Sequence, residues 1–395
     1  MKRYDLITPE GTKDLLFSDC LLQKNVRNKI SEIFSSSGYN KIVTPCLEFF
    51  DAFNKENMFF SQESMYKLSD RKGRLMVLRP DCTVPIARVV ATRLREAKLP
   101  IRLYYNQTIY TPNRTNAGKS DEIFQSGIEL IGTASKKADL EVLSLAIEVL
   151  SSFGEENFRL EIGDSGFFKV LVGKLTSDEN IREEIRALIE AKNYPALNDY
   201  LDTFGNNSII ATLKQLPSLF GGEEVFDKAA KLYSDDETDR ILSDLRDVYA
   251  ELKKLGYDGK ITVDLGIVNH ADYYTGIIMK GYLQGYGDEV LSGGRYDKLI
   301  SKFGYDVPAT GFAVNVDAVA SALRRNGNTA EVKKPDVLVF SDDEYAMEAL
   351  IHCDKLRESG KVVEFSVFDT YEETMEYAKE NKICEIVYYR GEENE

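Results

Sequence analysis

Two short stretches decide how this chain is interpreted. Residues 125–129 read Gln-Ser-Gly-Ile-Glu, and residues 268–276 read Val-Asn-His-Ala-Asp-Tyr-Tyr-Thr-Gly. Gln125 and Glu129 lie at positions i and i+4 of a predicted strand, so alternation places both side chains on one face. Carboxylate and amide oxygens suit an ammonium group, whereas Tyr and Gln suit a polar ring such as imidazole. These residue types predict a pocket for a small amino acid.

Each stretch also has an alternative explanation. A pair such as Gln125 and Glu129 can face solvent on an exposed strand, and two tyrosines before a strand are more often packing residues than ligand contacts. Inside a core, the pair would be costly unless its polar atoms were satisfied. The neighbouring segments favour a site, because Asp-Leu-Gly at 264–266 precedes the tyrosines and Ser-Gly-Gly-Arg-Tyr-Asp at 292–297 follows them.

Taken together, these segments resemble the histidine pocket of the histidyl-tRNA synthetases, which are class II aminoacyl-tRNA synthetases. The segment Leu-Arg-Pro-Asp-Cys-Thr at 78–83 matches the substrate loop of that family. The resemblance implies that Asp81, Gln125 and Glu129 contact the ammonium or imidazole and that the tyrosines shape the ring slot. Arg295 is a candidate for an additional ligand contact, to the carboxylate. The full set of expected histidine-binding residues is Asp81, Thr83, Gln125, Glu129, Tyr273 and Tyr274.

Three arginines of the synthetase pattern are missing. Thr111 stands where the family has an Arg on the α-phosphate of ATP, Asn269 replaces an Arg before the tyrosine pair, and Ala318 replaces one near the end of the fold. Adenylate formation develops charge on phosphate oxygens, and losing one stabilising group costs roughly two to three orders of magnitude in rate. Asn113 also replaces an expected acidic residue, whereas Arg114 or Lys119 could compensate. The pattern indicates a pocket that binds without catalysing.

A synthetase-like body without these arginines resembles the family of regulatory subunits of ATP phosphoribosyltransferase, the first step of histidine biosynthesis. That resemblance covers about 8–323. It implies a non-catalytic homodimer within a hetero-oligomer, which binds and activates the short-form catalytic subunit and takes histidine as the feedback effector. It implies no catalytic residue, no metal and no cofactor.

The implied fold class is α+β, a class II synthetase-like antiparallel sheet flanked by helices, followed by a small α/β domain. We expect the first domain over 1–325, with a charged helical insertion at about 166–256. Beyond a linker at 333–335, strand and helix patterns alternate over 333–395, which predicts a small α/β domain resembling a shortened anticodon-binding domain. Residues 42–48 match motif 1, which builds the class II dimer interface, and Pro45 matches its proline.

Composition narrows the function classes. The chain has 395 residues, a formal net charge of −15, five scattered cysteines and two histidines. The negative net charge argues against a nucleic-acid partner. The presence of only two histidines argues against a metal site. Scattered cysteines and a start without an apolar signal segment predict a cytoplasmic protein without membrane contact. The basic side chains at Arg79, Arg88, Arg93, Arg95 and Arg102 are expected mostly on a solvated helix face, with a partner surface as the alternative.

Three other functions stay open. The chain could be an active histidyl-tRNA synthetase with atypical ATP contacts, which would catalyse histidine-dependent ATP–pyrophosphate exchange. It could be a paralogue for another amino acid, or a structural dimer with a vestigial pocket. A structural dimer would not be stabilised by histidine.

Overall fold

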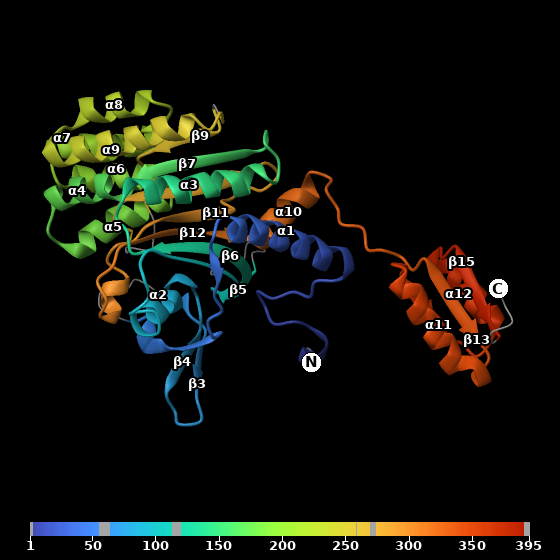
Figure 1. Ribbon diagram of the computed structural model, residues 1–395. Coiled ribbons are helices and arrows are strands. Elements are labelled where there is room, and N and C mark those ends of the chain that lie inside the picture. The colour runs from blue at the N-terminus through green and yellow to red at the C-terminus, as the bar shows by residue number, and fades with distance from the viewer. Residues whose placement is uncertain (1–2, 55–63, 113–119, 258, 269–273, 391–395) are drawn as a thin grey trace. The chain divides into compact units, whose positions relative to one another are not determined.

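The computed structural model describes residues 3–54, 64–112, 120–257, 259–268 and 274–390. The chain divides into two compact units, Met1–Thr329 and Ala330–Glu395. Figure 1 follows the helices and strands of both units.

A broad sheet forms the centre of the first unit. Most neighbouring strands are antiparallel, but β1 with β5 and β7 with β9 are parallel, so the sheet is mixed. This arrangement confirms the expected α+β class and adds parallel pairs to the expected antiparallel sheet. Among the described residues the sheet has nine strands, in the order β1 (Asn40–Lys41), β5 (Ile101–Tyr110), β6 (Glu122–Ile131), β12 (Ala309–Asn315), β11 (Leu291–Arg295), β10 (Ile277–Leu283), β7 (Phe158–Asp164), β9 (Ile261–Asp264) and β8 (Phe220–Gly221).

Three helices cover one face of this sheet. They are α1 (Phe17–Ser36), α3 (Lys136–Ser151) and α10 (Val316–Arg325), and Figure 1 shows them along the same side of the strands. Alternation in β6 explains the burial: Ile128 and Leu130 point into the main hydrophobic core beneath these helices. Gln125, Gly127 and Glu129 therefore point to the opposite face, which we call the site face.

A helical segment lies between β7 and β9. It comprises α4 (Ser165–Leu175), α5 (Glu179–Glu190), α6 (Tyr194–Asp202), α7 (Ser208–Gln215), α8 (Glu224–Leu232) and α9 (Asp236–Lys253). Side-chain caps begin several of these helices, and at α9 Asp235 and Thr238 form a reciprocal capping box. The segment packs into the same core as the sheet, so it supports the β7–β9 side of the unit.

A second, smaller sheet packs with α2 (Thr83–Thr92) near the site face. Its strands are β2 (Leu47–Phe49), β4 (Leu75–Leu78) and β3 (Lys67–Ser69), in that order. Val77 and helix residues such as Ile86 share a hydrophobic cluster with β5. This packing places α2 beside the central sheet.

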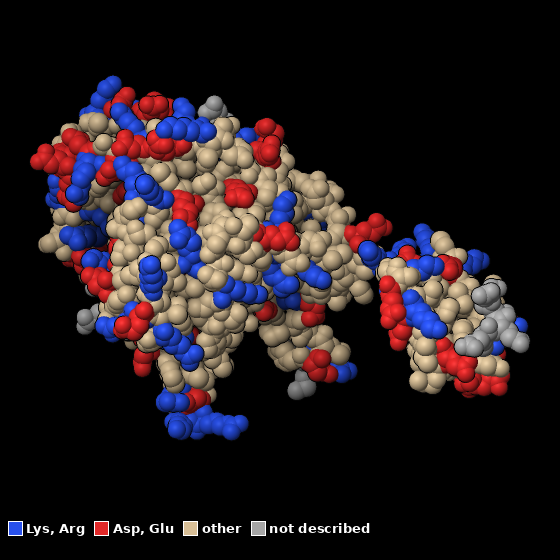
Figure 2. Space-filling model, in the orientation of Figure 1, with Lys and Arg blue, Asp and Glu red and all other residues tan. Residues whose placement is uncertain are grey.

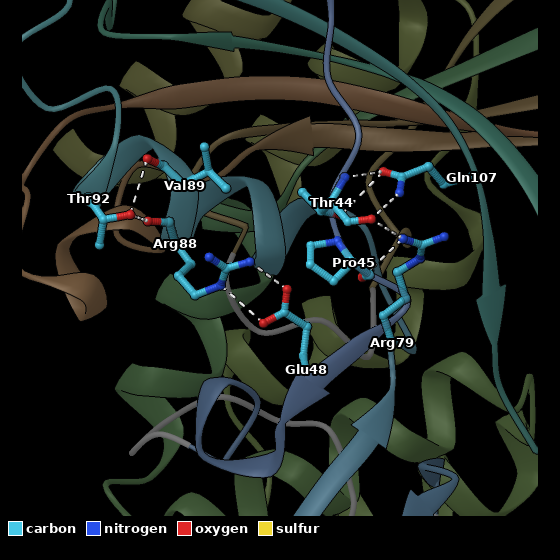
Figure 3. A network of polar contacts seen from close by, with 8 residues as sticks. All are labelled: Thr44, Pro45, Glu48, Arg79, Arg88, Val89, Thr92 and Gln107. Atoms are coloured by element: carbon cyan, nitrogen blue, oxygen red, sulfur yellow. Dashed lines mark hydrogen bonds and ion pairs between the residues drawn. The ribbon is translucent and has the colours of Figure 1, made fainter.

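Arg79 connects the segment before β2 of the smaller sheet to β5 of the central sheet. Its side chain is 5% exposed and donates hydrogen bonds to the carbonyl oxygens of Thr108 at 2.7 Å, Thr44 at 2.8 Å and Pro45 at 3.1 Å. Gln107 donates to the same Thr44 carbonyl at 2.7 Å (Figure 3). One guanidinium therefore joins motif 1 to β5.

The basic stretch around α2 is less solvated than expected. Arg88 forms a bidentate pair with Glu48, and Arg102 forms one with Glu141. With the buried Arg79, three of the five arginines are thus bound within the fold, whereas Arg93 and Arg95 are exposed. The expectation of a mainly solvated face was wrong because carboxylates and carbonyl groups distant in sequence meet this segment.

Charges of both signs are interspersed over the described surface that Figure 2 shows of the first unit. A cluster of positive side chains marks the tip of the β3–β4 hairpin, where Arg71, Lys72 and Arg74 are exposed. Arg74 also pairs with Asp70 at 2.7 Å. The hairpin tip is therefore the most basic feature of this view.

The second unit is a small α/β domain. Its parallel sheet has the order β14 (Val363–Phe365), β13 (Val337–Ser341) and β15 (Glu385–Tyr389). The helices α11 (Ala346–Glu358) and α12 (Tyr371–Asn381) pack on different hydrophobic clusters, since Ala349 and Cys353 belong to one and Ala378 to the other. The alternation of strands and helices is the one expected from the sequence.

Removing the guanidinium of Arg79 tests its structural role. We expect Arg79→Met to lower the free energy of unfolding by roughly 2–4 kcal/mol, because three buried carbonyl groups lose charged donors. Urea denaturation of this variant and of Arg93→Met, an exposed control at the C-terminal end of α2, provides the comparison. Equal stabilities of the two variants would contradict the assigned role.

Candidate functional site

The expected histidine-binding residues converge on one cavity of the site face. The cavity has a volume of about 80 Å³. Of the six expected residues, Asp81, Thr83, Gln125, Glu129 and Tyr274 line it, and Tyr273 lies outside the described residues. The remaining lining comes from Ser292, Gly293, Tyr296, Gly311, Phe312 and Ala313.

Glu129 is the buried centre of this cavity. Its side chain belongs to β6 and is 2% exposed. Thr83 donates a hydrogen bond from its hydroxyl to Oε1 at 2.7 Å, and the Tyr296 hydroxyl donates to Oε2. Burial raises the pKa of Glu129 to about 8, although both donors act in the opposite direction. Burial therefore favours the protonated form of this carboxyl near neutral pH.

A second carboxyl, that of Asp81, lies where the chain enters α2. Its Oδ1 accepts a hydrogen bond from the backbone N–H of Val84 at 2.7 Å, which orders the first turn of the helix. Burial raises the pKa of Asp81 to about 6. Two carboxyl groups with raised pKa values beside one cavity form an environment that a bound cation would stabilise.

Tyr274 reaches the cavity from a segment that α4 holds in place. Its carbonyl oxygen accepts hydrogen bonds from Lys169 Nζ at 2.8 Å and from the Ser165 hydroxyl at 3.2 Å. The Ser165 backbone N–H also donates to the Gly276 carbonyl at 3.0 Å. The first turn of the helical segment thus fixes the main chain at the end of the Tyr-Tyr motif.

Glycine is required beside the buried carboxyl. Gly311 pairs directly with Glu129 across β12 and β6, and a Cβ at this position would lie 2.3 Å from Glu129 Oε2. A Cβ on Gly127 would lie 2.5 Å from the hydroxyl of Tyr105. A side chain at Gly311 would therefore displace the Glu129 carboxyl, and one at Gly127 would displace the buried ring of Tyr105.

Arg295 does not line the cavity. Its guanidinium binds Asp139 of α3, with Nη2 and Oδ1 2.8 Å apart, and Asp297, with Nη1 and Oδ1 3.0 Å apart. Its neighbour Tyr296 reaches Glu129 instead and was absent from the expected site. Strand alternation contains the signal, because Ser292, Gly294 and Tyr296 fall on one face and Arg295 on the other.

The described lining of the cavity includes no lysine or arginine. A ligand carboxylate thus meets no cation among these residues, whereas an ammonium or imidazolium meets Asp81 and Glu129. The charge distribution favours the cationic groups of an amino acid over its carboxylate.

A larger cavity of about 680 Å³ adjoins the first and shares Gln125, Ser292 and Ala313 with it. Its lining contains four carboxylates, which outnumber the two cations Lys13 and Arg325. Arg325 already donates to the Gly285 carbonyl at 3.1 Å. The carboxylates are Glu122, Asp288, Glu289 and Asp317.

Of the two described positions at which the synthetase pattern has an arginine, Ala318 lines this cavity and Thr111 does not. Ala318 is buried in the first turn of α10, and the preceding carboxylate of Asp317 accepts hydrogen bonds from Gln23 at 2.7 Å and from the Phe124 N–H at 2.8 Å. The Thr111 backbone N–H donates to the Asp121 carbonyl at 2.8 Å. Asn269, Asn113, Arg114 and Lys119 lie outside the described residues. The described part of this cavity is poorly suited to a triphosphate.

Two further properties concern the described residues alone. Their His, Cys, Asp and Glu side chains form no group of three or more that could hold a metal ion. No described helix is both long enough and apolar enough to cross a bilayer.

Comparison with known proteins identifies the family of the chain. The family model for histidyl-tRNA synthetase matches residues 11–319. Two relatives named ATP phosphoribosyltransferase regulatory subunit are similar over nearly their whole length. The protein of Clostridium kluyveri is 44% identical over 94% of this chain and 95% of its own length, and that of Clostridium acetobutylicum is 42% identical over 98% and 95%.

Solved structures agree. A Bacillus halodurans protein, described as an ATP phosphoribosyltransferase regulatory subunit/histidyl-tRNA synthetase, has a TM-score of 0.84 at 29% identity and covers 98% of this chain and 99% of its own. Histidyl-tRNA synthetase of Nostoc has a TM-score of 0.77 at 22% identity, covering 96% and 90%, and supports the fold alone. The chain therefore belongs to the histidyl-tRNA synthetase-like family and, within it, to the ATP phosphoribosyltransferase regulatory subunits.

Proposed function

We propose that this chain activates the short-form catalytic subunit of ATP phosphoribosyltransferase and binds the histidine that inhibits the complex. The observation that carries the proposal is the pairing of two adjacent cavities. One is small and gathers five residues expected to bind histidine, and the other is acidic where adenylation needs positive charge. The chain then acts as a regulatory subunit without catalysis of its own.

Histidine is the effector that the small cavity suits. Its ammonium and imidazole can both pair with carboxylates, and Asp81 and Glu129 each supply one. Gln125 and Tyr274 add neutral polar partners at the same cavity. We assign histidine binding to Asp81, Thr83, Gln125, Glu129, Tyr273 and Tyr274, where Tyr273 rests on the sequence pattern alone.

A second copy of the chain is the partner that the small sheet suits. Alternation turns Leu47 and Phe49 of β2 away from the body, and each is 45% exposed. Cross-strand pairing aligns them with Met76 and Leu78 of β4, and Leu68 of β3 completes the row. We call these five residues the outer face. Leu47, Phe49 and Leu68 are exposed, and Met76 and Leu78 are half-buried. An apolar row of this kind supports a homodimer through the motif 1 region.

The proposed localisation of the protein is cytoplasmic. All five cysteines are described, and all are free, with Cys20 and Cys384 exposed. Exposed free thiols are typical of a reducing compartment. The protein would encounter the catalytic subunit in that compartment.

Catalysis as a histidyl-tRNA synthetase is the second candidate, because the Bacillus halodurans structure carries both names. An active synthetase would exchange pyrophosphate into ATP only when histidine is present. Such exchange by the purified chain would favour this candidate over the regulatory one.

Reconstitution tests the regulatory function directly. We expect phosphoribosyl-ATP formation by the catalytic subunit of the same organism to rise when this chain is added and to fall again with added histidine. The assay compares the catalytic subunit alone, the mixture, and the mixture with histidine. An unchanged rate with a well-folded partner would refute the proposal.

Substitutions in the pocket test the assigned residues. Gln125→Ala and Tyr273→Phe should each raise the histidine concentration for half-maximal inhibition by about tenfold, because each removes a polar contact with the ligand. Sedimentation should show unchanged self-association. Glu148→Ala, an exposed position on α3 that lines neither cavity, is the control, and equal shifts in all three variants would contradict the assignment.

The raised pKa of Glu129 predicts how stability depends on pH. The folded chain keeps this proton up to pH about 8, whereas the unfolded chain releases it near pH 4. The contribution of Glu129 to stability is therefore complete below the unfolded pKa and is lost as pH rises toward 8. In the absence of histidine, the free energy of unfolding of the unsubstituted chain should fall between pH 5 and pH 8. That fall should exceed the fall for Glu129→Gln by roughly 2–4 kcal/mol.

Urea denaturation at the two pH values measures this difference. Asp264, a carboxyl group whose pKa burial also raises, does not line the cavity, is present in both proteins and cancels in the comparison. Parallel pH dependences of the two proteins would show that Glu129 is ionised in the folded chain at neutral pH.

A further inference from the structure

Helix α2 extends from the small cavity to the small sheet. It begins at Thr83, whose hydroxyl donates to Glu129, and Asp81 orders its first turn. Its ten residues, Thr83–Thr92, span about 15 Å. One short, continuous helix thus connects the cavity to the small sheet.

Arg88 connects this helix to β2. Its Nη2 lies 2.5 Å from Glu48 Oε1, and its Nε lies 3.0 Å from Glu48 Oε2 (Figure 3). The Glu48 side chain is 7% exposed and that of Arg88 is 30% exposed. A bidentate pair with one buried partner has a strong directional preference and holds the helix and the strand in one relative position.

Arg79 provides a second connection between the same two regions. It lies two residues before Asp81, and its side chain donates to the carbonyl groups of Thr44 and Pro45. Its backbone N–H also donates to the Cys46 carbonyl at 3.0 Å. The loop that carries Asp81 is therefore tied to the segment that leads into β2.

The orientation of β2 relates these contacts to the outer face. Strand alternation turns Glu48 inward toward Arg88 and turns its neighbours Leu47 and Phe49 outward. A displacement of Glu48 consequently displaces both outward side chains. One face of β2 therefore contacts Arg88 of α2, and its opposite face belongs to the outer face.

We propose that the Arg88–Glu48 pair couples histidine binding in the small cavity to self-association through the outer face. Glu48 and Arg88 act as positioning residues, since neither lines the cavity. The inference rests on the proposed function for both the ligand and the second copy. Coupling of two binding events is reciprocal, so histidine must change self-association by the same factor by which self-association changes histidine affinity.

The experiment measures this factor in both directions. Self-association of the full chain is followed by sedimentation with and without saturating histidine, and histidine affinity is measured by calorimetry below and above the association midpoint. We expect a factor of about five or more. If the chain stays associated at the lowest accessible concentration, Val43→Glu, at a residue of the motif 1 segment that is 71% exposed, brings association into range.

Variants of Glu48 and Arg88 test whether this ion pair carries the coupling. Glu48→Gln, Arg88→Gln and their combination form a double-mutant cycle, and each should reduce the factor to less than about twofold. Glu141→Gln is the matched control, because Glu141 forms a similar bidentate pair with Arg102 away from α2. The control should keep the full factor. Melting temperatures of all variants without ligand separate lost coupling from lost stability.

The outcomes are distinct. A chain that binds histidine but shows a factor of one, or that stays monomeric, overturns the coupling and leaves the histidine site intact. A full factor in Glu48→Gln, or an equal loss in Glu141→Gln, overturns the role of this pair. Failure of the unsubstituted chain to bind histidine at any concentration refutes the proposed function itself.

Discussion

The site face depends on keeping the Glu129 carboxyl away from water. An isolated charge in such a position is costly, so the group must be neutral or surrounded by donors. Thr83 and Tyr296 provide those donors from the start of α2 and from the residue after β11. Segments far apart in the sequence are thus positioned by one buried group, and Gly311 leaves the space it needs.

Much of this arrangement could be predicted from the sequence. The alternation of Gln125, Gly127 and Glu129 predicts their shared face, and the Tyr-Tyr-Thr-Gly and Gly-Gly-Arg-Tyr-Asp segments identify the family that the comparisons confirm. Such patterns are local and follow from the two-residue period of a strand. The α+β class followed from the same resemblance and is confirmed, with parallel pairs at two places in the sheet.

What the sequence did not reveal depends on contacts between distant residues. Arg295 was named as a candidate contact because a ligand carboxylate calls for a cation, but Asp139 on α3 already binds that guanidinium. Arg79 and Arg88 were expected on a solvated face, and nothing near them in sequence indicates Thr44, Pro45 or Glu48 as partners. Strand alternation by itself places Arg295 and Tyr296 on opposite faces. The partners of Arg79 and Arg88 required the three-dimensional structure.

Recognition and catalysis place different demands on the same fold. Binding an amino acid requires partners for groups that are charged in the ground state, and Asp81 and Glu129 can meet that demand. Adenylation requires positive charge where phosphate charge develops, because only interactions stronger in the transition state accelerate a reaction. The adjoining cavity presents mainly carboxylates instead. A chain with the first property and without the second can use its binding energy only to favour one conformation of an assembly, and α2 is the element through which that preference would reach the rest of the unit.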